Sequence, residues 1–569
     1  MDHGPIRGSV CVIGAGPSGL VAAKTLLERG YSVVVYESTD AIGGAFRHKA
    51  YEHCRLVSSK YITAFSDFRL ASEHEHPSIP EYVAYLERYA AHFALSDVIQ
   101  FNAAVRRVRR RGEAYDVQLV GESIQHRYDA VAVCSGLHNV PHIPTALRGF
   151  SGTALHSSEY KTDAPFRGRR ILIVGAGETG MDLAYQAVRV GKSVDLCIRN
   201  GFLSIPHQIG SVALDTLISN VGECAYQHRW VEDVKFRWWA STFFIRLGLF
   251  FGSGTSRGYA QWAATADPVK RGHHIVNKQC KAMPYINRPF KAKSPWWARI
   301  WRGVGEVDDT SRPAITLHNS AIASVVGGTV TFADGSHCAP DVLLCATGYR
   351  QRFPFIYSAR GGGRRGSTDV GGSSSDADVN DDPLPPVRLI CSEDEPNLSY
   401  IGFVRPNVGA IPPMSELQTL WWIERMEGRM DGKRLAAPTY KLLSRNARTK
   451  AYAVDYGAYM HDLARDCGAA PDLFARSTSW WWWSHPRALI TYVIGQAYVG
   501  VFRLHGPFAP TDAGDVAELR RVYETELWST IVRRGVCANV VFGAVAVVFS
   551  LINAAVLLVE LGLRMCRIV

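Results

Sequence analysis

Short apolar segments alternate with segments of helical period along most of the chain. An apolar segment at residues 9–13 is followed by a glycine-rich turn, a helical segment at residues 20–30 and a second apolar segment at residues 32–37. The same order recurs later, where an apolar segment at residues 171–174, a glycine-rich turn and a helical segment precede residues 193–198. Strands that alternate with helices in this way are typical of parallel sheets. The pattern therefore predicts an α/β protein with two similar units.

Both glycine-rich turns have the spacing of a dinucleotide-binding site. They read Gly14-x-Gly16-x-x-Gly19 and Gly175-x-Gly177-x-x-Gly180. Between a strand and a helix, such glycines allow a tight turn and place a pyrophosphate at the helix N-terminus. The candidate cofactor-binding residues are Gly14, Ala15, Gly16, Pro17, Ser18 and Gly19 in the first turn, and Gly175, Gly177, Glu178, Thr179 and Gly180 in the second. We therefore expect two Rossmann-like dinucleotide-binding domains.

The residue that ends the second strand of each unit distinguishes the two nucleotides. Glu37 ends this strand in the first unit, and Arg199 ends it in the second. An acidic residue suits a ribose with a free 2′-OH, whereas an arginine accommodates a 2′-phosphate. The contrast assigns FAD to the first site and NADPH to the second; the alternative is that Arg199 is an ordinary surface residue. Two nucleotide sites in one chain indicate an enzyme that passes electrons between its cofactors.

The C-terminal segment has a different pattern. Residues 540–559 are apolar apart from Ser550 and Asn553, and arginines flank them on both sides. About 20 such residues form a helix roughly 30 Å long, which matches the hydrocarbon core of a bilayer. We expect a single membrane-spanning helix at residues 537–563; the alternative is a buried core helix. The N-terminal residues show no signal-peptide pattern, so we expect the catalytic part in the cytosol.

Composition and charge narrow the class of protein. The 569 residues exceed one ordinary domain, and the content of 47% hydrophobic and 20% charged residues is that of a globular protein. The net charge of +11 fits either a basic soluble surface or attraction to anionic lipids and cofactor phosphates. No nucleic-acid-binding motif is found, and the 12 cysteines include no C-x-x-C pair. We therefore expect no nucleic-acid partner, no metal site and no disulfide framework.

Three further segments differ from the alternating pattern. Aromatic residues at 237–251, within an expected insertion at 205–300, favour either a buried helix or a segment at a membrane interface. Residues 359–386 are rich in glycine, serine and aspartate, which predicts a disordered surface insertion. Residues 431–536 have a helical pattern.

The segment FSGTALHSSEY at residues 150–160 matches F-x-G-x-x-x-H-x-x-x-[Y/F], the identifying motif of flavin-containing monooxygenases. The chain resembles that family rather than the related Baeyer–Villiger enzymes, whose motif ends in tryptophan where this chain has Tyr160. Further similar segments are GAGPSG at 14–19, GGAF at 43–46, CATGY at 345–349 and FVRPNVGAIPPMSELQ at 403–418. The resemblance covers residues 9–430. It adds these expected cofactor-binding residues: Gly44, Ala45, Phe46, Thr347 and Gly348.

The family's fold implies an FAD-binding domain in two pieces with an NADPH-binding domain inserted between them. The expected boundaries are 1–162 for the first FAD-binding part, 163–330 for the NADPH-binding domain with its insertion at 205–300, 331–430 for the second FAD-binding part with its insertion at 359–386, 431–536 for a helical C-terminal region and 537–563 for the membrane helix.

The family's chemistry implies an enzyme that uses NADPH and O2. In that chemistry NADPH reduces the flavin, the reduced flavin and O2 form a C4a-hydroperoxyflavin, and one oxygen atom passes to a nitrogen or sulfur nucleophile. The expected partners are therefore a small nucleophilic substrate and O2, and the family's habit places the anchor in the endoplasmic reticulum membrane. In the motif, His156 either hydrogen-bonds near the domain junction or belongs to a hinge; we do not assign it as a catalytic base.

One position departs from the family pattern. The family has a segment resembling N-S-S-K whose asparagine lies beside the reactive flavin edge, and alignment on Ser59 and Lys60 puts Val57 at that position. Valine cannot donate a hydrogen bond, so Ser58 and Ser59 are the candidate catalytic residues, unless the alignment is shifted by one position. The departure motivates an alternative function, an NADPH oxidase that releases hydrogen peroxide. A further alternative, from another class, is a membrane-tethered flavoprotein without turnover whose nucleotide sites are structural.

Overall fold

The computed structural model of the chain describes residues 7–199, 202, 204–209, 211–218, 277–291, 309–357, 381–430, 432, 435–441, 452–473 and 479–566. The aromatic segment at 237–251 lies outside the described residues. Most of the two expected insertions, at 205–300 and 359–386, lies outside them as well. The expectations for these segments therefore stay predictions.

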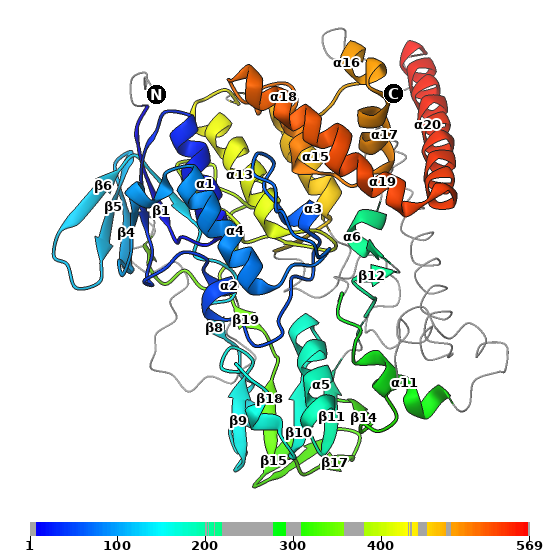
Figure 1. The fold of residues 1–569 in the computed structure, drawn as a ribbon. Helices are drawn as coiled ribbons and strands as arrows, with labels where there is room; N and C mark the ends of the chain where they lie inside the picture. The colour runs from blue at the N-terminus through cyan, green and yellow to red at the C-terminus, as the bar shows by residue number, and fades with distance from the viewer. Residues whose placement is uncertain are drawn as a thin grey trace.

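The first sheet consists of five parallel strands in the order β21-β7-β1-β2-β3 (Figure 1). Its central strands are short β-branched segments that are buried on both faces, as is typical of parallel sheets covered by helices. Helix α1 (Pro17–Glu28) follows β1, and helix α13 (Ile411–Met426) packs on α1. The strands are β1 (Ser9–Ile13), β2 (Ser32–Tyr36), β3 (Ile99–Gln100), β7 (Ala130–Val133) and β21 (Leu398–Tyr400).

The second sheet also has five parallel strands, in the order β14-β11-β10-β18-β9. Alternate residues of β10 point to opposite faces: Ile171 and Ile173 pack with helix α5 (Glu178–Val190). Leu172 and Val174 pack with the antiparallel sheet β15-β16-β17. The strands are β9 (Thr153–His156), β10 (Arg170–Val174), β11 (Ser193–Ile198), β14 (Ile315–Asn319), β18 (Val342–Cys345), β15 (Ile322–Val326), β16 (Thr329–Phe332) and β17 (His337–Cys338).

The chain completes the second sheet before it returns to the first. All strands of the second sheet lie between β7 and β21 in the sequence, and the two connecting segments pair with each other through β8 (Val140–Pro141) and β19 (Tyr349–Arg350). In Figure 1 the two sheets form separate lobes, with the second sheet below the first. The predicted α/β class with Rossmann-type units is confirmed, whereas the exact domain boundaries stay a prediction.

Smaller elements complete the first lobe and its connections. A four-stranded sheet in the order β20-β4-β5-β6 lies beside the first sheet, at the left of Figure 1. The elements are α2 (Ala45–His48), α3 (Lys60–Thr63), α4 (Ile79–His92), η1 (Leu95–Val98), β4 (Val105–Arg111), β5 (Ala114–Leu119), β6 (Gln125–Tyr128), η2 (Thr145–Leu147), η3 (Ala164–Phe166), β12 (Gln208–Ile209), β13 (Val212–Ala213), α6 (Leu214–Leu217), α11 (Met283–Lys291), β20 (Ile356–Tyr357), β22 (Arg405–Pro406) and β23 (Ala453–Val454).

The C-terminal part is helical and is joined to the first lobe by buried ion pairs. Arg503 is 4% exposed and donates to Asp67 (2.6 Å) and Glu416 (2.8 Å), and Lys24 also contacts Asp67. The helices are α15 (Tyr456–Cys467), α16 (Ser479–Ser484), α17 (Pro486–Ile494), η5 (Val499–Arg503), α18 (Ala513–Val522), η6 (Tyr523–Leu527), α19 (Trp528–Arg534) and α20 (Val536–Met565).

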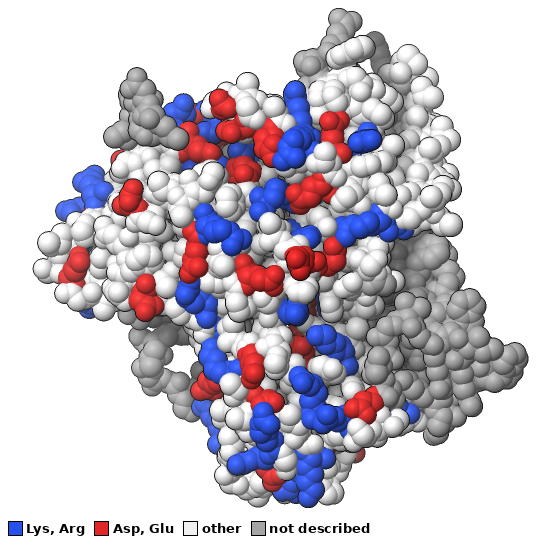
Figure 2. Space-filling view, viewed as in Figure 1, with Lys and Arg blue, Asp and Glu red and all other residues white. Residues whose placement is uncertain are grey.

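Helix α20 is, within the described part of the chain, the one helix long and apolar enough to cross a membrane, over Val536–Leu563. Its inner side packs on α17 and α19 through Ile494, Ile531, Ala546 and Phe549. Most of its other valine and leucine side chains are exposed. In Figure 2 the surface along α20, at the upper right, carries no charged residues, whereas both signs of charge cover the rest of the described face.

Candidate active site

The first glycine turn has the geometry that the spacing predicts. Gly14 has φ +106°, which favours glycine, and its N–H donates to the Tyr36 carbonyl across the sheet (2.8 Å). A Cβ at Gly14 would lie 2.8 Å from the Cys134 carbonyl oxygen, and one at Gly19 would overlap the Gly14 carbonyl oxygen. These glycines hold α1 close against β1. The turn therefore brings the N-terminus of α1 to the carboxyl end of the sheet.

No side chain caps the N-terminus of α1. Gly16 is the N-cap of α1 and offers no side chain to cap the helix, and Pro17 occupies the first turn. A Cβ at Gly44 would lie 3.2 Å from the Gly16 Cα, so the loop at Gly44, before Ala45 in α2, approaches the same turn. An uncapped helix N-terminus beside close-packed glycines suits a pyrophosphate.

Glu37 lies beside this turn, at the end of β2. It is 6% exposed, and its carboxylate accepts hydrogen bonds from the backbone N–H groups of Ala15 (2.6 Å) and Thr39 (2.9 Å). Its Oε1 also accepts from the hydroxyls of Thr39 (2.9 Å) and Ser38 (3.2 Å), whereas Oε2 accepts from Ala15. Oε2 therefore retains acceptor capacity for a hydroxyl donor such as that of a ribose. The first turn and Glu37 therefore fit an adenine dinucleotide such as FAD.

The other residues predicted for the first site lie around it. Ser18 does not point freely into the site, because its hydroxyl bonds the Ser415 hydroxyl of α13 (2.9 Å). Phe46 packs edge-on against Tyr82, with ring centroids 4.8 Å apart. Ala45 is exposed.

The second glycine turn repeats the geometry of the first. Gly175 also has φ +106°, and its N–H donates to the Cys197 carbonyl (2.9 Å). A Cβ at Gly175 would lie 2.5 Å from the Ala346 carbonyl oxygen, whereas a Cβ at Gly177 would meet nothing within 4 Å. Gly177 is the uncapped N-cap of α5, with backbone angles close to those of Gly16. Gly180 corresponds to Gly19, since its Cβ would overlap the carbonyl oxygen of the first glycine.

Polar groups surround the second turn. Arg199 follows β11 directly and is exposed, so its guanidinium is accessible to a phosphate. Asn277 donates to the Ala176 carbonyl within the turn (2.9 Å). Glu178 in the first turn of α5 forms an ion pair with Arg405 (3.9 Å), and the neighbouring Thr179 is exposed. The open space, the uncapped helix and the exposed arginine fit NADPH.

Ser58 and Ser59 lie in a buried polar cluster. The Ser58 hydroxyl accepts from Thr63 (2.9 Å), and the Ser59 N–H donates to the Asp215 carboxylate of α6 (2.6 Å). The Ser59 hydroxyl and the second Asp215 oxygen are buried and have no protein partner in the described structure. Asp215 is 1% exposed, and Val57 beside this cluster is half-buried. The cluster thus offers a hydroxyl and a carboxylate oxygen that are available for hydrogen bonding.

Two histidines lie next to this cluster. The rings of His76 and His207 meet edge-on, with centroids 4.6 Å apart. Burial lowers the pKa of His76, and burial together with His76 lowers the pKa of His207 to about 4. Both imidazoles are therefore neutral at pH 7.

His156, in the identifying motif, is part of the connection between the lobes. Its Nε2 bonds the Gly348 carbonyl (3.0 Å), its Nδ1 bonds the Ser158 hydroxyl (2.8 Å), and its ring packs on Tyr349. Thr347 donates through its hydroxyl to the His142 carbonyl in the same junction. Thr347 and Gly348, predicted to bind a cofactor, therefore lie at the end of β18 beside the second turn and make junction contacts.

Two interactions that sequence reasoning missed connect parts of the chain far apart in sequence. Asp215 reaches Ser59 from within the segment 205–300, where no motif marks it. The Tyr51 hydroxyl donates to Asp182 of α5 (2.6 Å), and burial raises the pKa of both groups. Asp182 is the fifth residue of α5, which begins ETGMDL, and nothing in this local sequence indicates such a contact. 

Two parallel sheets, each with a glycine turn, an uncapped helix and a charged residue after its second strand, fit a protein that binds two dinucleotides. Comparison with known proteins identifies the family to which the chain belongs. A family model described as flavin-binding monooxygenase-like matches residues 7–211. The chain is 33% identical to monooxygenase ptmN of Penicillium ochrochloron over 88% of this chain and 86% of that protein. It is 32% identical to monooxygenase PC-14 of Penicillium crustosum over 92% of this chain and 93% of that protein.

The chain belongs to the flavin-binding monooxygenase-like family. It is an FAD-dependent monooxygenase, and FAD and NADPH are its cofactors. Among solved structures, S-allyl-L-cysteine S-oxygenase from Allium sativum has a similar fold, with a TM-score of 0.51 and 18% identity over 91% of this chain and 98% of that chain. The predicted family, enzyme class and cofactors are confirmed.

Proposed function

We propose that the chain takes hydride from NADPH, bound at the second turn, onto FAD, bound at the first, and transfers one oxygen atom of O2 to a nitrogen or sulfur nucleophile. One observation carries this assignment: the two glycine turns have the same geometry, but the strands β2 and β11 that come after them are followed by side chains of opposite charge, Glu37 and Arg199. An acid repels a 2′-phosphate and an arginine attracts one.

The described residues would bind and orient the two cofactors. Gly14, Gly16 and the N-terminus of α1 would hold the pyrophosphate of FAD, and Glu37 its ribose hydroxyls. Gly177, the N-terminus of α5 and Arg199 would hold NADPH. Bound FAD would supply the redox chemistry, accepting hydride from NADPH and passing oxygen from O2 to the substrate.

The Ser59–Asp215 cluster supports the oxygen-transfer step. In this chain Val57 offers no hydrogen-bond donor, but the buried Ser59 hydroxyl, two residues further on, has an unused proton. Asp215 holds the Ser59 backbone in place through its N–H. We infer that Ser59 donates the hydrogen bond that asparagine donates in other members of the family, with Ser58 beside it.

The test is reduction of the purified, FAD-loaded enzyme by NADPH, followed by admission of O2 in the presence of amines and sulfides. The proposal expects rapid bleaching of the flavin by NADPH and oxygenated product in proportion to the NADPH consumed. Reduction that is equally fast with NADH would contradict the role of Arg199. Hydrogen peroxide without oxygenated product, across a broad panel of amines and sulfides, would contradict oxygen transfer.

Val57 favours a second candidate function, an NADPH oxidase that releases hydrogen peroxide. A half-buried valine cannot help to retain activated oxygen. The discriminating variant is Val57→Asn, with Val57→Leu, which is close to asparagine in size but has no hydrogen-bond donor, as the control. The oxidase proposal expects Val57→Asn to lower the peroxide released per NADPH severalfold. An unchanged peroxide yield in Val57→Asn would exclude Val57 as the cause of any leak.

We further propose that α20 anchors the enzyme in a membrane, with the catalytic lobes in the cytosol and the endoplasmic reticulum as the membrane. The uncharged surface along α20 and the two arginines that precede it support this placement (Figure 2). We propose the domain boundaries 1–162, 163–330 and 331–430 for the FAD, NADPH and second FAD segments. Two strands of the second sheet, β9 (Thr153–His156) and β18 (Val342–Cys345), lie outside the middle segment.

A further inference from the structure

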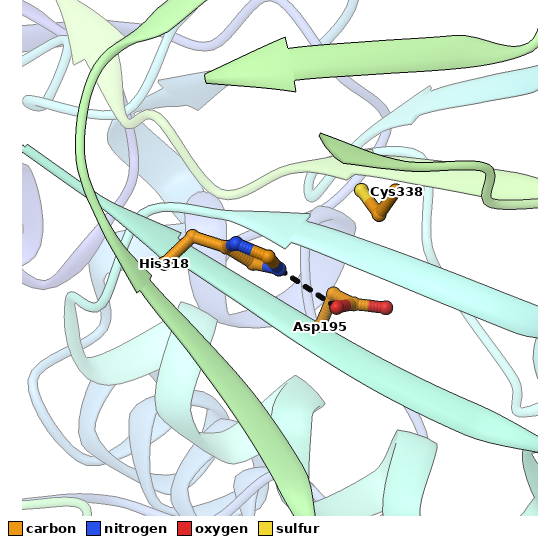
Figure 3. Close-up of side chains that lie close together, drawn as sticks. All are labelled: Asp195, His318 and Cys338. Atoms are coloured by element: carbon orange, nitrogen blue, oxygen red, sulfur yellow. Dashed lines mark hydrogen bonds and ion pairs between the residues drawn. The ribbon is translucent and has the colours of Figure 1, made fainter. Parts of the chain in front are cut away.

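Three side chains that can bind a metal converge on the second sheet, outside both glycine turns (Figure 3). Asp195 comes from β11, His318 from β14 and Cys338 from β17. One ligand atom of each lies within 4.8 Å of the others. They lie on the side of the sheet that carries β15-β16-β17, whereas α5 covers the other side.

The strand register explains how residues so far apart in sequence meet. Strands β11 and β14 pair in parallel with Cys197 opposite His318, so these two side chains share one face of the sheet. Asp195 stands two residues before Cys197 and therefore points to the same face. Strand β17 pairs with β16 with Cys338 opposite Val330, which places Cys338 over that face. Two strands of one sheet and one strand of its cover thus supply the three ligands.

The surroundings of the cluster are largely apolar, and they fix the His318 ring. His318 is 8% exposed and stacks on Phe332, with centroids 4.1 Å apart and the planes 14° from parallel. Val330 and Phe332 are buried in the same layer. A carboxylate, an imidazole and a thiol at such a place need partners, because burial without them is costly. The ring orientation presents Nε2 to Asp195 and leaves Nδ1 on the opposite side.

The hydrogen bonds of the His318 Nδ1 atom determine whether Nε2 of the neutral ring donates or accepts a hydrogen bond. Nδ1 lies 3.3 Å from the Ser336 hydroxyl, and that hydroxyl donates its proton to Asp334 (2.7 Å). Because a hydroxyl has one proton, Nδ1 is then the donor to Ser336. In neutral histidine, Nε2 is consequently an acceptor. It faces the Asp195 carboxylate oxygen at 2.8 Å, so the contact requires either a second proton on His318, which makes an ion pair with Asp195, or a metal ion in place of that proton.

We propose that Asp195, His318 and Cys338 bind a divalent transition-metal ion of the zinc class. Imidazole, thiolate and carboxylate together are ligands of zinc, whereas calcium and magnesium prefer sets of oxygen atoms. Tetrahedral zinc with such ligands places the ligand atoms about 3.3–3.8 Å apart. The three ligand atoms lie within 4.8 Å of one another, and the Nε2–Oδ1 separation of 2.8 Å would have to widen by about 0.5 Å to admit the ion. The relay from Nδ1 through Ser336 to Asp334 is the outer support that metal-bound histidines have.

The ion has a structural consequence for the second lobe. It joins β17, and with it the antiparallel sheet β15-β16-β17, to β11 and β14 of the parallel sheet. Three protein ligands leave one coordination position for water. Cys197 is the nearest alternative ligand, since it shares the face, but its thiol already donates to the Ser320 carbonyl (3.5 Å). We therefore place Cys197 outside the ligand set.

The experiment uses the full-length, FAD-loaded protein in detergent, freed of metal by a chelator and then titrated with Zn²⁺ or Co²⁺. The proposal expects about one ion per chain, measured by elemental analysis after desalting. It also expects a thiolate-to-cobalt charge-transfer absorption band in the Co²⁺ form. Cys338→Ser should abolish that band, and His318→Gln should lower the affinity for Zn²⁺ at least tenfold. The matched control, Cys197→Ser, should keep both the band and the affinity.

Two results overturn the proposal, and neither depends on a variant that folds poorly. Wild-type protein without the cobalt–thiolate band has no thiolate-ligated metal, and the cluster is then a hydrogen-bonded Asp195–His318 pair with a nearby thiol. Wild-type protein whose second-lobe unfolding midpoint does not shift with Zn²⁺ has no ion that joins the two sheets. A Cys338→Ser variant that keeps the band, or a Cys197→Ser variant that loses it, shows that the ligand set is wrong.

Discussion

Gly175→Ala should destabilise the second lobe and leave the first lobe folded. The added Cβ would lie 2.5 Å from the Ala346 carbonyl oxygen, whereas real Cβ atoms stay at least 3.0 Å away, so the turn must retreat by at least 3.0 − 2.5 = 0.5 Å. Overpacking of this kind costs about 1–3 kcal/mol, and a non-glycine residue at a positive φ costs about 1–3 kcal/mol more. We therefore expect the second lobe to lose about 2–6 kcal/mol of stability.

Gly177→Ala is the matched control, because its Cβ would meet nothing within 4 Å and its φ of −71° suits alanine. This variant should be as stable as the wild type, but its methyl group would occupy the space in front of α5. We expect the dissociation constant for NADPH to rise about tenfold or more, or about 1.4 kcal/mol. Gly16→Ala should act correspondingly on the first turn and lower the FAD content instead.

The assays are urea unfolding, FAD content of the purified protein and the rate of flavin reduction as a function of NADPH concentration. Gly175→Ala should lose both stability and reduction by NADPH while it retains FAD, since the first turn belongs to another sheet. Wild-type reduction kinetics in Gly177→Ala would refute the reasoning, because a pyrophosphate in front of α5 cannot tolerate the methyl group.

Three further predictions test other parts of the molecule. Arg199→Ala should raise the KM for NADPH about tenfold and leave that for NADH unchanged, and the ratio of the two KM values measures this. Deletion of residues 536–569 should move the protein from the membrane to the soluble fraction in a flotation assay, and unchanged partitioning would disprove the anchor. Asp67→Asn should lower the free energy of unfolding by about 3–5 kcal/mol, because it leaves the buried Arg503 without one of its carboxylates. Although burial opposes ionisation, Arg503 and Lys24 hold the pKa of Asp67 below its usual range. The stabilisation by ionised Asp67 is therefore present at neutral pH and is lost as the pH falls below about 4. Urea midpoints measured from pH 7 to pH 3 should fall more steeply in the wild type than in Asp67→Asn.

The parts of the site that could be predicted from sequence are those in which local residues determine the geometry. The glycine spacing fixes each turn, and Gly14 and Gly175 accordingly share the same φ of +106°. Glu37 and Arg199 follow at the end of the next strand, where the βαβ connection brings them beside the turn. In both cases a single βαβ unit contains all the information.

The parts that could not be predicted depend on contacts between distant segments. Asp215 reaches Ser59 across 156 residues of sequence, from a segment without periodicity or motif. Asp195 and His318 are 123 residues apart in sequence. The expectation of no metal site came from the lack of closely spaced cysteine pairs, a criterion that cannot detect ligands so far apart. The cluster of these two residues with Cys338 allows a direct test of that expectation. Strand order and register bring such residues together, and neither can be read from the local pattern.

The identifying motif acquires a physical meaning from the junction between the lobes. Gly152 is required there because a Cβ would lie 2.7 Å from the Phe150 ring and 3.0 Å from the Asp341 carbonyl oxygen. His156 ties the end of β9 to Gly348, in the segment that returns to the first lobe, and β8 pairs with β19 in the same place. In the proposed reaction hydride passes between cofactors bound to two separate sheets, so the junction would set their relative position. The motif therefore lies where the two lobes connect, and the contacts of His156 are those of a positioning residue rather than of a catalytic base.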